Sequence, residues 1–241
     1  MKRRWAALAL ILAMWSGVSA AGPLEDIAVQ LDVDVGRSRE ESTAQPRLLG
    51  VSSMEHSGPL EVNGDYVAWL VQEGTLIDYP VTQCGDNSYY LTHSFNGEES
   101  KAGCLFLDYR NGGCFQDELS AVYGHHMKDD SMLATLVEYK RQSYYEEHPT
   151  LALYTPCGDY EVKLFAGVIA SGKDDFLQPF FGSDEEFDSY WSGVKEQSTF
   201  DSDVNVERGD RVLALVTCTY EFDNARYIVF GRMDEMAASD A

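Results

Sequence analysis

The sequence predicts a mainly β domain, built as a sandwich or a closed barrel with peripheral helices. The chain has 241 residues, of which 44% are hydrophobic, enough for one domain with a substantial core. Short runs rich in β-branched and aromatic residues recur along the chain. Gly, Asn, Asp and Pro residues separate these runs, which is typical of strands joined by turns. We predict strands over 75–81, 89–91, 104–107, 121–123, 151–154, 160–170, 211–217 and 226–231.

Two segments break this pattern with helical spacing. The first covers 131–139, where the apolar residues fall on one face of a helix. The second covers 183–195 and begins with Ser183 and three acidic residues, a capping-box pattern that stabilises a helix start. The apolar face of this second helix consists of Phe187, Tyr190, Trp191 and Val194.

The N-terminus carries the features of an export signal. Basic residues at 2–4 precede an apolar run, and small residues follow it up to position 21. Residues 18–20 are similar to a signal-peptidase site, and the apolar run is shorter than the ~20 residues that span a bilayer comfortably. These features favour cleavage. Residues 22–59 are mixed and polar and indicate a linker or stalk, after which the domain begins near Leu60.

The formal net charge is -22. A surface this acidic repels the phosphates of nucleic acids, so nucleic-acid binding is disfavoured. It favours solubility and is compatible with basic substrates.

Five cysteines are present, namely Cys84, Cys104, Cys114, Cys157 and Cys218. An odd number in an exported chain leaves at least one thiol outside any intrachain disulfide. Four of them can form two disulfides in three connectivities, or pack as reduced, buried thiols. The spacings do not resemble those of a zinc finger, so we expect no metal site.

Three residues carry the functional groups that cysteine-based acyl transfer requires. Cys218 ends one apolar run and Arg226 lies in the next, so two adjacent strands would place a thiol beside a guanidinium. His125 follows a strand end and a glycine, and a histidine can deliver a proton near pH 7. Alternative interpretations remain: a structural or disulfide-bonded Cys218, and an Arg226 paired with Glu221 or Asp223. His126 is a rival candidate for the proton-transferring histidine only because it lies next to His125.

These motifs give the chain a resemblance to the class B sortases, the cell-surface transpeptidases of Gram-positive bacteria. The family pattern has a Tyr-Gly-His turn, a Thr-Cys strand end and an arginine on the next strand, here at 123–125, 217–218 and 226. Further segments match in order between about 60 and 233. They are 78–83, 86–91, 129–136, 148–149 and 187–210.

The resemblance implies a closed barrel of about eight strands, with a helix before the last two, as a catalytic domain over 60–235. It implies that Cys218 is the nucleophile, His125 the general acid and Arg226 the group that stabilises the oxyanion. Thr217 precedes the nucleophile and is expected to support substrate binding, with its side chain pointing away from that of Cys218. His126 becomes a flanking residue.

The implied reaction cleaves a sorting motif after threonine, near the C-terminus of a secreted protein. A thioester forms and is released by an amine of a cell-wall precursor or a pilin. No metal or organic cofactor is implied. Sortases usually retain the N-terminal segment, so the resemblance implies that 1–21 anchors the enzyme at the outer face of the membrane, with cleavage and secretion as the alternative. The rival functions are a hydrolytic cysteine peptidase and a non-catalytic exported binding barrel.

Overall fold

The computed structural model describes residues 55–173 and 176–236. The predicted export and anchor segment at 1–21 and nearly all of the predicted linker at 22–59 lie outside the described residues. Within the two described ranges, no helix has both the length and the apolar character needed to cross a membrane.

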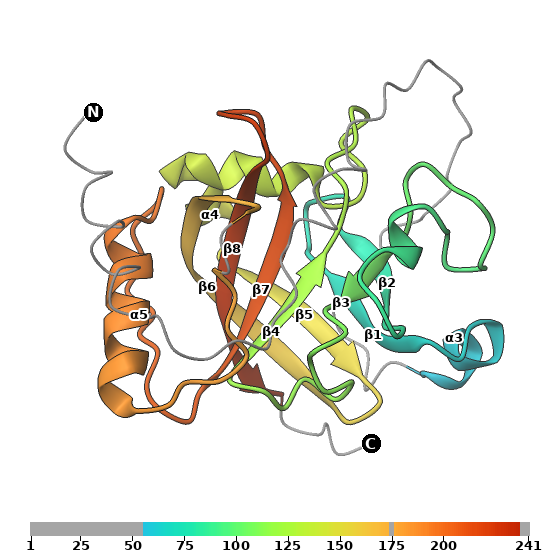
Figure 1. Cartoon of the computed structure of the whole chain (residues 1–241), viewed down its shortest axis with the longest axis horizontal. Coiled ribbons are helices and arrows are strands. Elements are labelled where there is room, and N and C mark those ends of the chain that lie inside the picture. The colour runs from blue at the N-terminus through green and yellow to red at the C-terminus, as the bar shows by residue number, and fades with distance from the viewer. Residues whose placement is uncertain (1–54, 174–175, 237–241) are drawn as a thin grey trace.

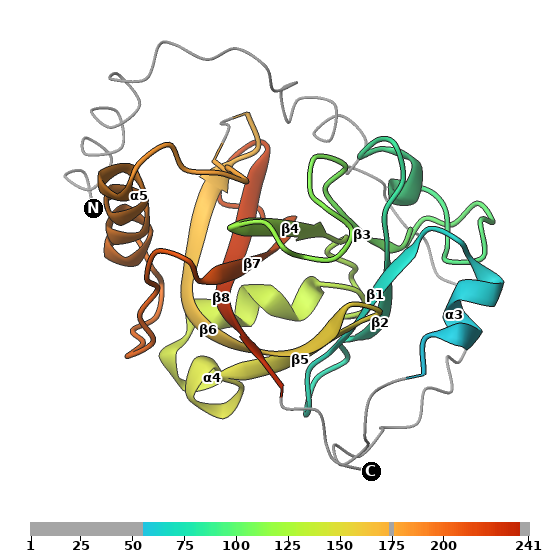
Figure 2. The same ribbon diagram turned by 90° about the horizontal axis from the view of Figure 1, so that it is seen from below.

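Eight strands close into one barrel, which confirms the predicted fold class (Figures 1 and 2). The order around the barrel is β1-β2-β3-β4-β7-β8-β6-β5, and β5 pairs with β1 to complete the ring. The pairs β2–β3 and β4–β7 are parallel, and the others are antiparallel. The strands are β1 (Tyr66–Val71), β2 (Asp78–Thr82), β3 (Leu105–Leu107), β4 (Leu119–Tyr123), β5 (Thr150–Thr155), β6 (Gly158–Ser171), β7 (Arg211–Cys218) and β8 (Ala225–Glu235).

Alternation along each strand divides the core into two layers. Leu213 and Leu215 of β7 belong to the cluster that fills the barrel, together with Tyr227 of β8. Val216 of β7 and Ile228 of β8 belong to a second cluster on the outer face. The same sheet is therefore buried on both sides near the end of β7.

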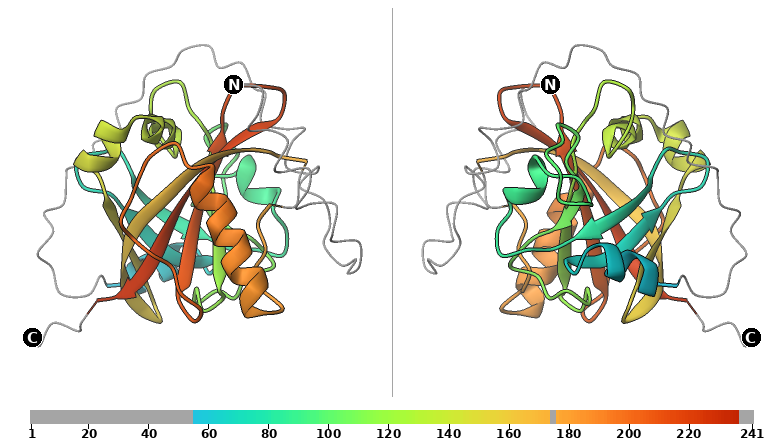
Figure 3. Two further views of the ribbon diagram at one scale, coloured as in Figure 1. Left: turned by 90° about the vertical axis from the view of Figure 1, so that its left-hand side faces the viewer. Right: turned by 90° about the vertical axis from the view of Figure 1, so that its right-hand side faces the viewer.

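The outer cluster is covered by α5 (Asp184–Glu196), the helix that precedes the last two strands (Figure 3). Ser183 caps it as the sequence predicts, because its side chain accepts a hydrogen bond from the main-chain N–H of Glu186 at 3.2 Å. Its apolar face packs on the barrel through Trp191, whose ring centroid lies 5.4 Å from that of Phe165 and 5.5 Å from that of Phe230. This packing fixes the outer faces of β6 and β8.

Two local predictions were wrong, and turn chemistry explains both. Residues Tyr89–Leu91 form a 3₁₀ turn, η1, instead of a strand. The carboxylate of Asp86 accepts hydrogen bonds from the main-chain N–H groups of Ser88 and Tyr89, which bends the chain before it can extend.

The predicted helix at 131–139 begins later, as a 3₁₀ helix, η2 (Ala134–Lys140). Asp130 and Met132 have φ angles of 64° and 58°, in the left-handed region, so a regular helix cannot include them. Two further short helices, α3 (Ser57–Val62) and α4 (Gln142–Glu147), lie outside the sequence prediction.

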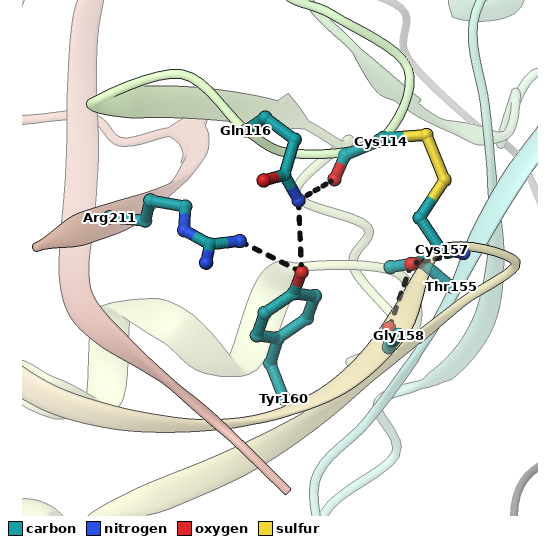
Figure 4. Close-up of a disulfide and its surroundings, with 7 residues drawn as sticks. All are labelled: Cys114, Gln116, Thr155, Cys157, Gly158, Tyr160 and Arg211. Carbon is teal, nitrogen blue, oxygen red and sulfur yellow. Dashed lines mark hydrogen bonds between the residues drawn. A yellow bond between two sulfur atoms is a disulfide. The ribbon is translucent and has the colours of Figure 1, made fainter.

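One disulfide joins Cys114, after β3, to Cys157, in the β5–β6 turn, with Cα atoms 5.7 Å apart (Figure 4). Cys84, Cys104 and Cys218 carry thiols, so the alternative of two disulfides is wrong. Gln116 donates to the hydroxyl of Tyr160 at 3.1 Å, and Arg211 donates to the same hydroxyl at 2.9 Å. The disulfide therefore lies at the end of the barrel where β7 begins, whereas Cys218 lies where β7 ends.

We predict that the double variant C114S/C157S loses stability without change at Cys218. The disulfide spans 43 residues, and a crosslink of that length stabilises a fold by about 2–4 kcal/mol. The seven residue steps from Arg211 to Cys218 separate it from that thiol by roughly 23 Å. Urea unfolding measures the first effect, and the alkylation rate of Cys218 measures the second. Unchanged stability, or an altered alkylation rate in folded protein, would contradict the account.

Candidate active site

Cys218 and Arg226 lie directly opposite each other on neighbouring strands. Cys218 is the last residue of β7, and it pairs in register with Arg226, the second residue of β8. Residues opposite each other in an antiparallel pair point to the same face of the sheet. Val216 and Ile228, two residues away on each strand, belong to the outer cluster. The thiol and the guanidinium therefore share the outer face of the barrel.

The guanidinium of Arg226 is buried and has no acid partner among the described residues. The residue is 8% exposed, and Nη1 donates to the main-chain oxygen of Ala225 at 3.0 Å. Its Nη2 atom has no hydrogen-bond partner within residues 55–173 and 176–236. The sequence left open a pairing with Glu221 or Asp223. Glu221 instead pairs with Lys140, and Asp223 lies exposed.

A shallow, open pocket lies beside Arg226 on this face. Tyr123, Val216 and Ile228 line the strand side of this pocket, and Phe176 and Leu177 line it from the connection between β6 and α5. A buried cation with an unused donor at the edge of a pocket can stabilise an anion that forms there. The arrangement suits an oxyanion derived from a carbonyl group.

His125 follows β4, which runs parallel to β7 and lies next to it. The main chain before it is fastened to the end of β7 by two hydrogen bonds. Gly124 donates its N–H to the oxygen of Val216 at 3.1 Å, and Thr217 donates its hydroxyl to the oxygen of Gly124 at 2.9 Å. The glycine is required because a Cβ atom there would collide with a methyl group of Leu105.

The ring of His125 is oriented by η1. Its Nε2 atom lies 2.7 Å from the main-chain oxygen of Leu91, so Nε2 carries a proton and donates it. Nδ1 is then the atom that gains or loses a proton. Burial lowers the pKa of His125, and the hydrogen bond to Leu91 raises it in part, which leaves the pKa below its ordinary value of 6.5. A protonated His125 is thus a stronger acid than a free imidazolium.

His126 and Thr217 act on the main chain around these groups. The Nδ1 atom of His126 donates to the oxygen of Cys218 at 2.9 Å, and its ring lies 5.5 Å from the exposed ring of Tyr220. Thr217 is 2% exposed, pairs with Tyr227 of the barrel interior and uses its hydroxyl on Gly124. This geometry favours a positioning role for Thr217 over direct contact with substrate.

The two other thiols lie in surroundings that disfavour their thiolate forms. Burial raises the pKa of Cys104 to about 11. Burial also raises the pKa of Cys84, and the negative charges of Asp86 and Asp65 raise it further. A thiol is nucleophilic as its thiolate, so the raised pKa values disfavour Cys84 and Cys104 as nucleophiles. Among the described residues, no group of three or more His, Cys, Asp and Glu side chains is placed to hold a metal ion.

Sequence reasoning missed Leu91, because an acceptor on the main chain leaves no side-chain signature. It also missed Asp108, which is 1% exposed and accepts a hydrogen bond from the hydroxyl of Tyr123 at 3.0 Å. Burial raises the pKa of Asp108, but hydrogen bonds and charge from Arg110 hold it below its usual value. A buried carboxylate thus orients the tyrosine that lines the pocket.

No family model matches the chain. Sortase B of Listeria monocytogenes is 37% identical over 175 residues, which cover 72% of this chain and 71% of that protein. Sortase B of Staphylococcus aureus is 31% identical over 175 residues, covering 72% of each chain. A solved Staphylococcus aureus sortase B–substrate complex has a TM-score of 0.71 at 30% identity, covering 75% of this chain and 84% of that one.

The sortase B relatives match 72% of this chain in sequence, and the solved sortase B structure matches 75% of it in fold. This similarity favours a catalytic role over the alternative of a non-catalytic exported binding barrel. The chain belongs to the class B sortases, which are cysteine transpeptidases.

Proposed function

We propose that this sortase cleaves its sorting motif after threonine through a thioester on Cys218, and that an amine of the cell wall or of a pilin releases the product. The proposal is supported above all by Arg226, which pairs in register with Cys218 and has a buried Nη2 atom without a hydrogen-bond partner in the described part of the chain. A charged donor in this state is available to the oxygen of a tetrahedral intermediate.

The first half of the reaction begins with Cys218 as the thiolate and His125 protonated, and Sγ of Cys218 forms a bond to the threonine carbonyl carbon. The carbonyl oxygen takes up the electron pair, and the guanidinium of Arg226 stabilises its negative charge. The intermediate then collapses, the C–N bond breaks, and His125 gives its proton to the departing amine. A thioester remains on Cys218, and His125 is neutral.

In the second half, the acceptor amine attacks the thioester carbon. His125 takes the proton that the amine loses, Arg226 again stabilises the oxyanion, and Cys218 leaves as a thiolate. One of the similar solved structures is a sortase B complexed with triglycine, which makes this peptide a reasonable first acceptor to test. The substrate peptide would lie in the pocket between Tyr123 and Leu177.

Sortases act at the cell surface of Gram-positive bacteria. We place the catalytic domain of this chain, residues 60–235, outside the cell, with the segment at 1–21 as its membrane anchor. The proposal for 1–21 rests on the order of basic, apolar and small residues in the sequence.

The full chain, incubated with Asn-Pro-x-Thr and Leu-Pro-x-Thr peptides, tests the reaction. With triglycine or hydroxylamine present, mass spectrometry should detect cleavage after threonine and capture of the amine. C218A should abolish both products. Cleavage with water as the only acceptor, even at high triglycine, would indicate a hydrolytic peptidase, and activity in C218A would overturn the assignment of the nucleophile.

Replacing Thr217 with valine tests the link between the β7 end and the His125 turn. T217V keeps the shape of the side chain but leaves the oxygen of Gly124 without its donor. We expect kcat/KM to fall roughly fivefold, which is the effect of losing a hydrogen bond of about 1 kcal/mol in the transition state.

The matched control is T155V. Thr155 is also 2% exposed and donates to a glycine oxygen, that of Gly158 at 2.8 Å, in the β5–β6 hairpin at the far end of the barrel. We expect T155V to lower stability and leave kcat/KM unchanged in folded protein. Equal effects of the two variants on kcat/KM would refute the positioning role of Thr217.

A further inference from the structure

Glu221 is an anion in the loop that connects the nucleophile to the arginine. The loop covers residues 219–224, between Cys218 at the end of β7 and Ala225 at the start of β8. Glu221 is therefore three residues after Cys218 and five before Arg226. A carboxylate on so short a loop is a natural partner for an arginine at its base.

The carboxylate of Glu221 instead interacts with two other groups. Lys140, the last residue of η2, forms an ion pair with one oxygen of Glu221. The hydroxyl of Thr219 donates to the other oxygen at 2.6 Å, and Lys140 also donates to that hydroxyl at 2.7 Å. Burial raises the pKa of Glu221, but the hydrogen bonds with Lys140 and Thr219 hold it below its usual value, so Glu221 is charged at neutral pH.

Lys140 holds this carboxylate on the side of the hairpin opposite to Arg226. Its Nζ atom lies 5.1 Å from the ring centroid of Tyr227, and Tyr227 belongs to the cluster that fills the barrel. Arg226, the preceding residue on the same strand, points to the outer face. The ammonium group thus draws Glu221 towards the inner side, at the barrel end closed by η2.

We propose that Lys140 is a positioning residue that sequesters Glu221 and so keeps Arg226 available to the substrate. The inference rests on the proposed role of Arg226 as the group that stabilises the oxyanion. Without Lys140, Glu221 loses its cation, and the loop can turn its carboxylate towards the unused Nη2 atom of Arg226. An ion pair formed there would compete with the oxyanion for the same donor.

The test is a pair of single variants, K140M and E221Q, and their combination, assayed in the full chain with the reactive peptide and triglycine. We expect K140M to lower kcat/KM by about tenfold or more, mainly through kcat, because the charge competes with the transition state. E221Q alone should stay within about threefold of wild type, and K140M/E221Q should recover to that level.

Recovery in the double variant distinguishes the charge from loop tethering. If Lys140 acts only by fastening the loop, removal of Glu221 leaves K140M inactive, and the proposal fails. K140Q serves if K140M does not fold, since its amide can still donate to Thr219 but carries no charge. K163M is the matched control, because Lys163 of β6 is also a lysine held in ion pairs, with Glu161 and Asp234, but away from the site.

R226A, measured in parallel, distinguishes a failure of the proposed role of Arg226 from a failure of the proposed role of Lys140. Full activity in R226A would overturn the proposed function of Arg226, and with it the reason for sequestering Glu221. An inactive R226A together with a fully active K140M would leave the proposed function in place and overturn the role of Lys140.

Discussion

The pairing of β7 with β8 is the constraint on which the active site depends. Cys218 and Arg226 share one face because they are direct partners in this ladder. A slip of one residue would turn one of the two side chains into the barrel. The register is held along the whole length of the strands, since both faces of this sheet are buried, one by the barrel core and the other by α5. The packing that stabilises the barrel therefore also aligns Cys218 with Arg226.

The site also contains a group that is unfavourable for folding. Arg226 is a buried guanidinium with no acid partner among the residues that the structure describes, so it loses hydration without full compensation. Two acids of the described part of the chain are bound elsewhere: Glu221 pairs with Lys140, and Asp108 is held by Arg110 and Tyr123. Arg226 is thus kept ready for an anion that exists only during the reaction, which is how a fixed charge lowers a barrier more than it favours substrate binding.

Much of this was predictable from local patterns. The apolar runs around Cys218 and Arg226 predict two adjacent strands, and the motif at 123–125 predicts the turn that carries His125. Contacts between distant parts of the chain were not predictable. Lys140 and Thr219 are 79 residues apart, and Leu91 contributes a main-chain oxygen that any residue could supply. The start of η2 was missed because Met132 adopts a left-handed φ, a conformation that methionine does not favour. The disulfide pairing was open for a simpler reason, because four cysteines allow three connectivities.

The most direct test of the account asks whether an unneutralised positive charge lies beside the Cys218 thiol. Iodoacetate and iodoacetamide alkylate thiols alike, but only iodoacetate is an anion, so the ratio of their rates reports the local charge. Cys84, which lies near Asp86 and Asp65, is an internal reference thiol with negative charges as neighbours. We predict that the iodoacetate-to-iodoacetamide ratio at Cys218 exceeds both the ratio at Cys84 and that in the unfolded chain, and that R226Q removes the excess. A ratio at Cys218 no higher than in the unfolded chain would contradict the central claim, whereas an excess that vanishes in R226Q would establish it.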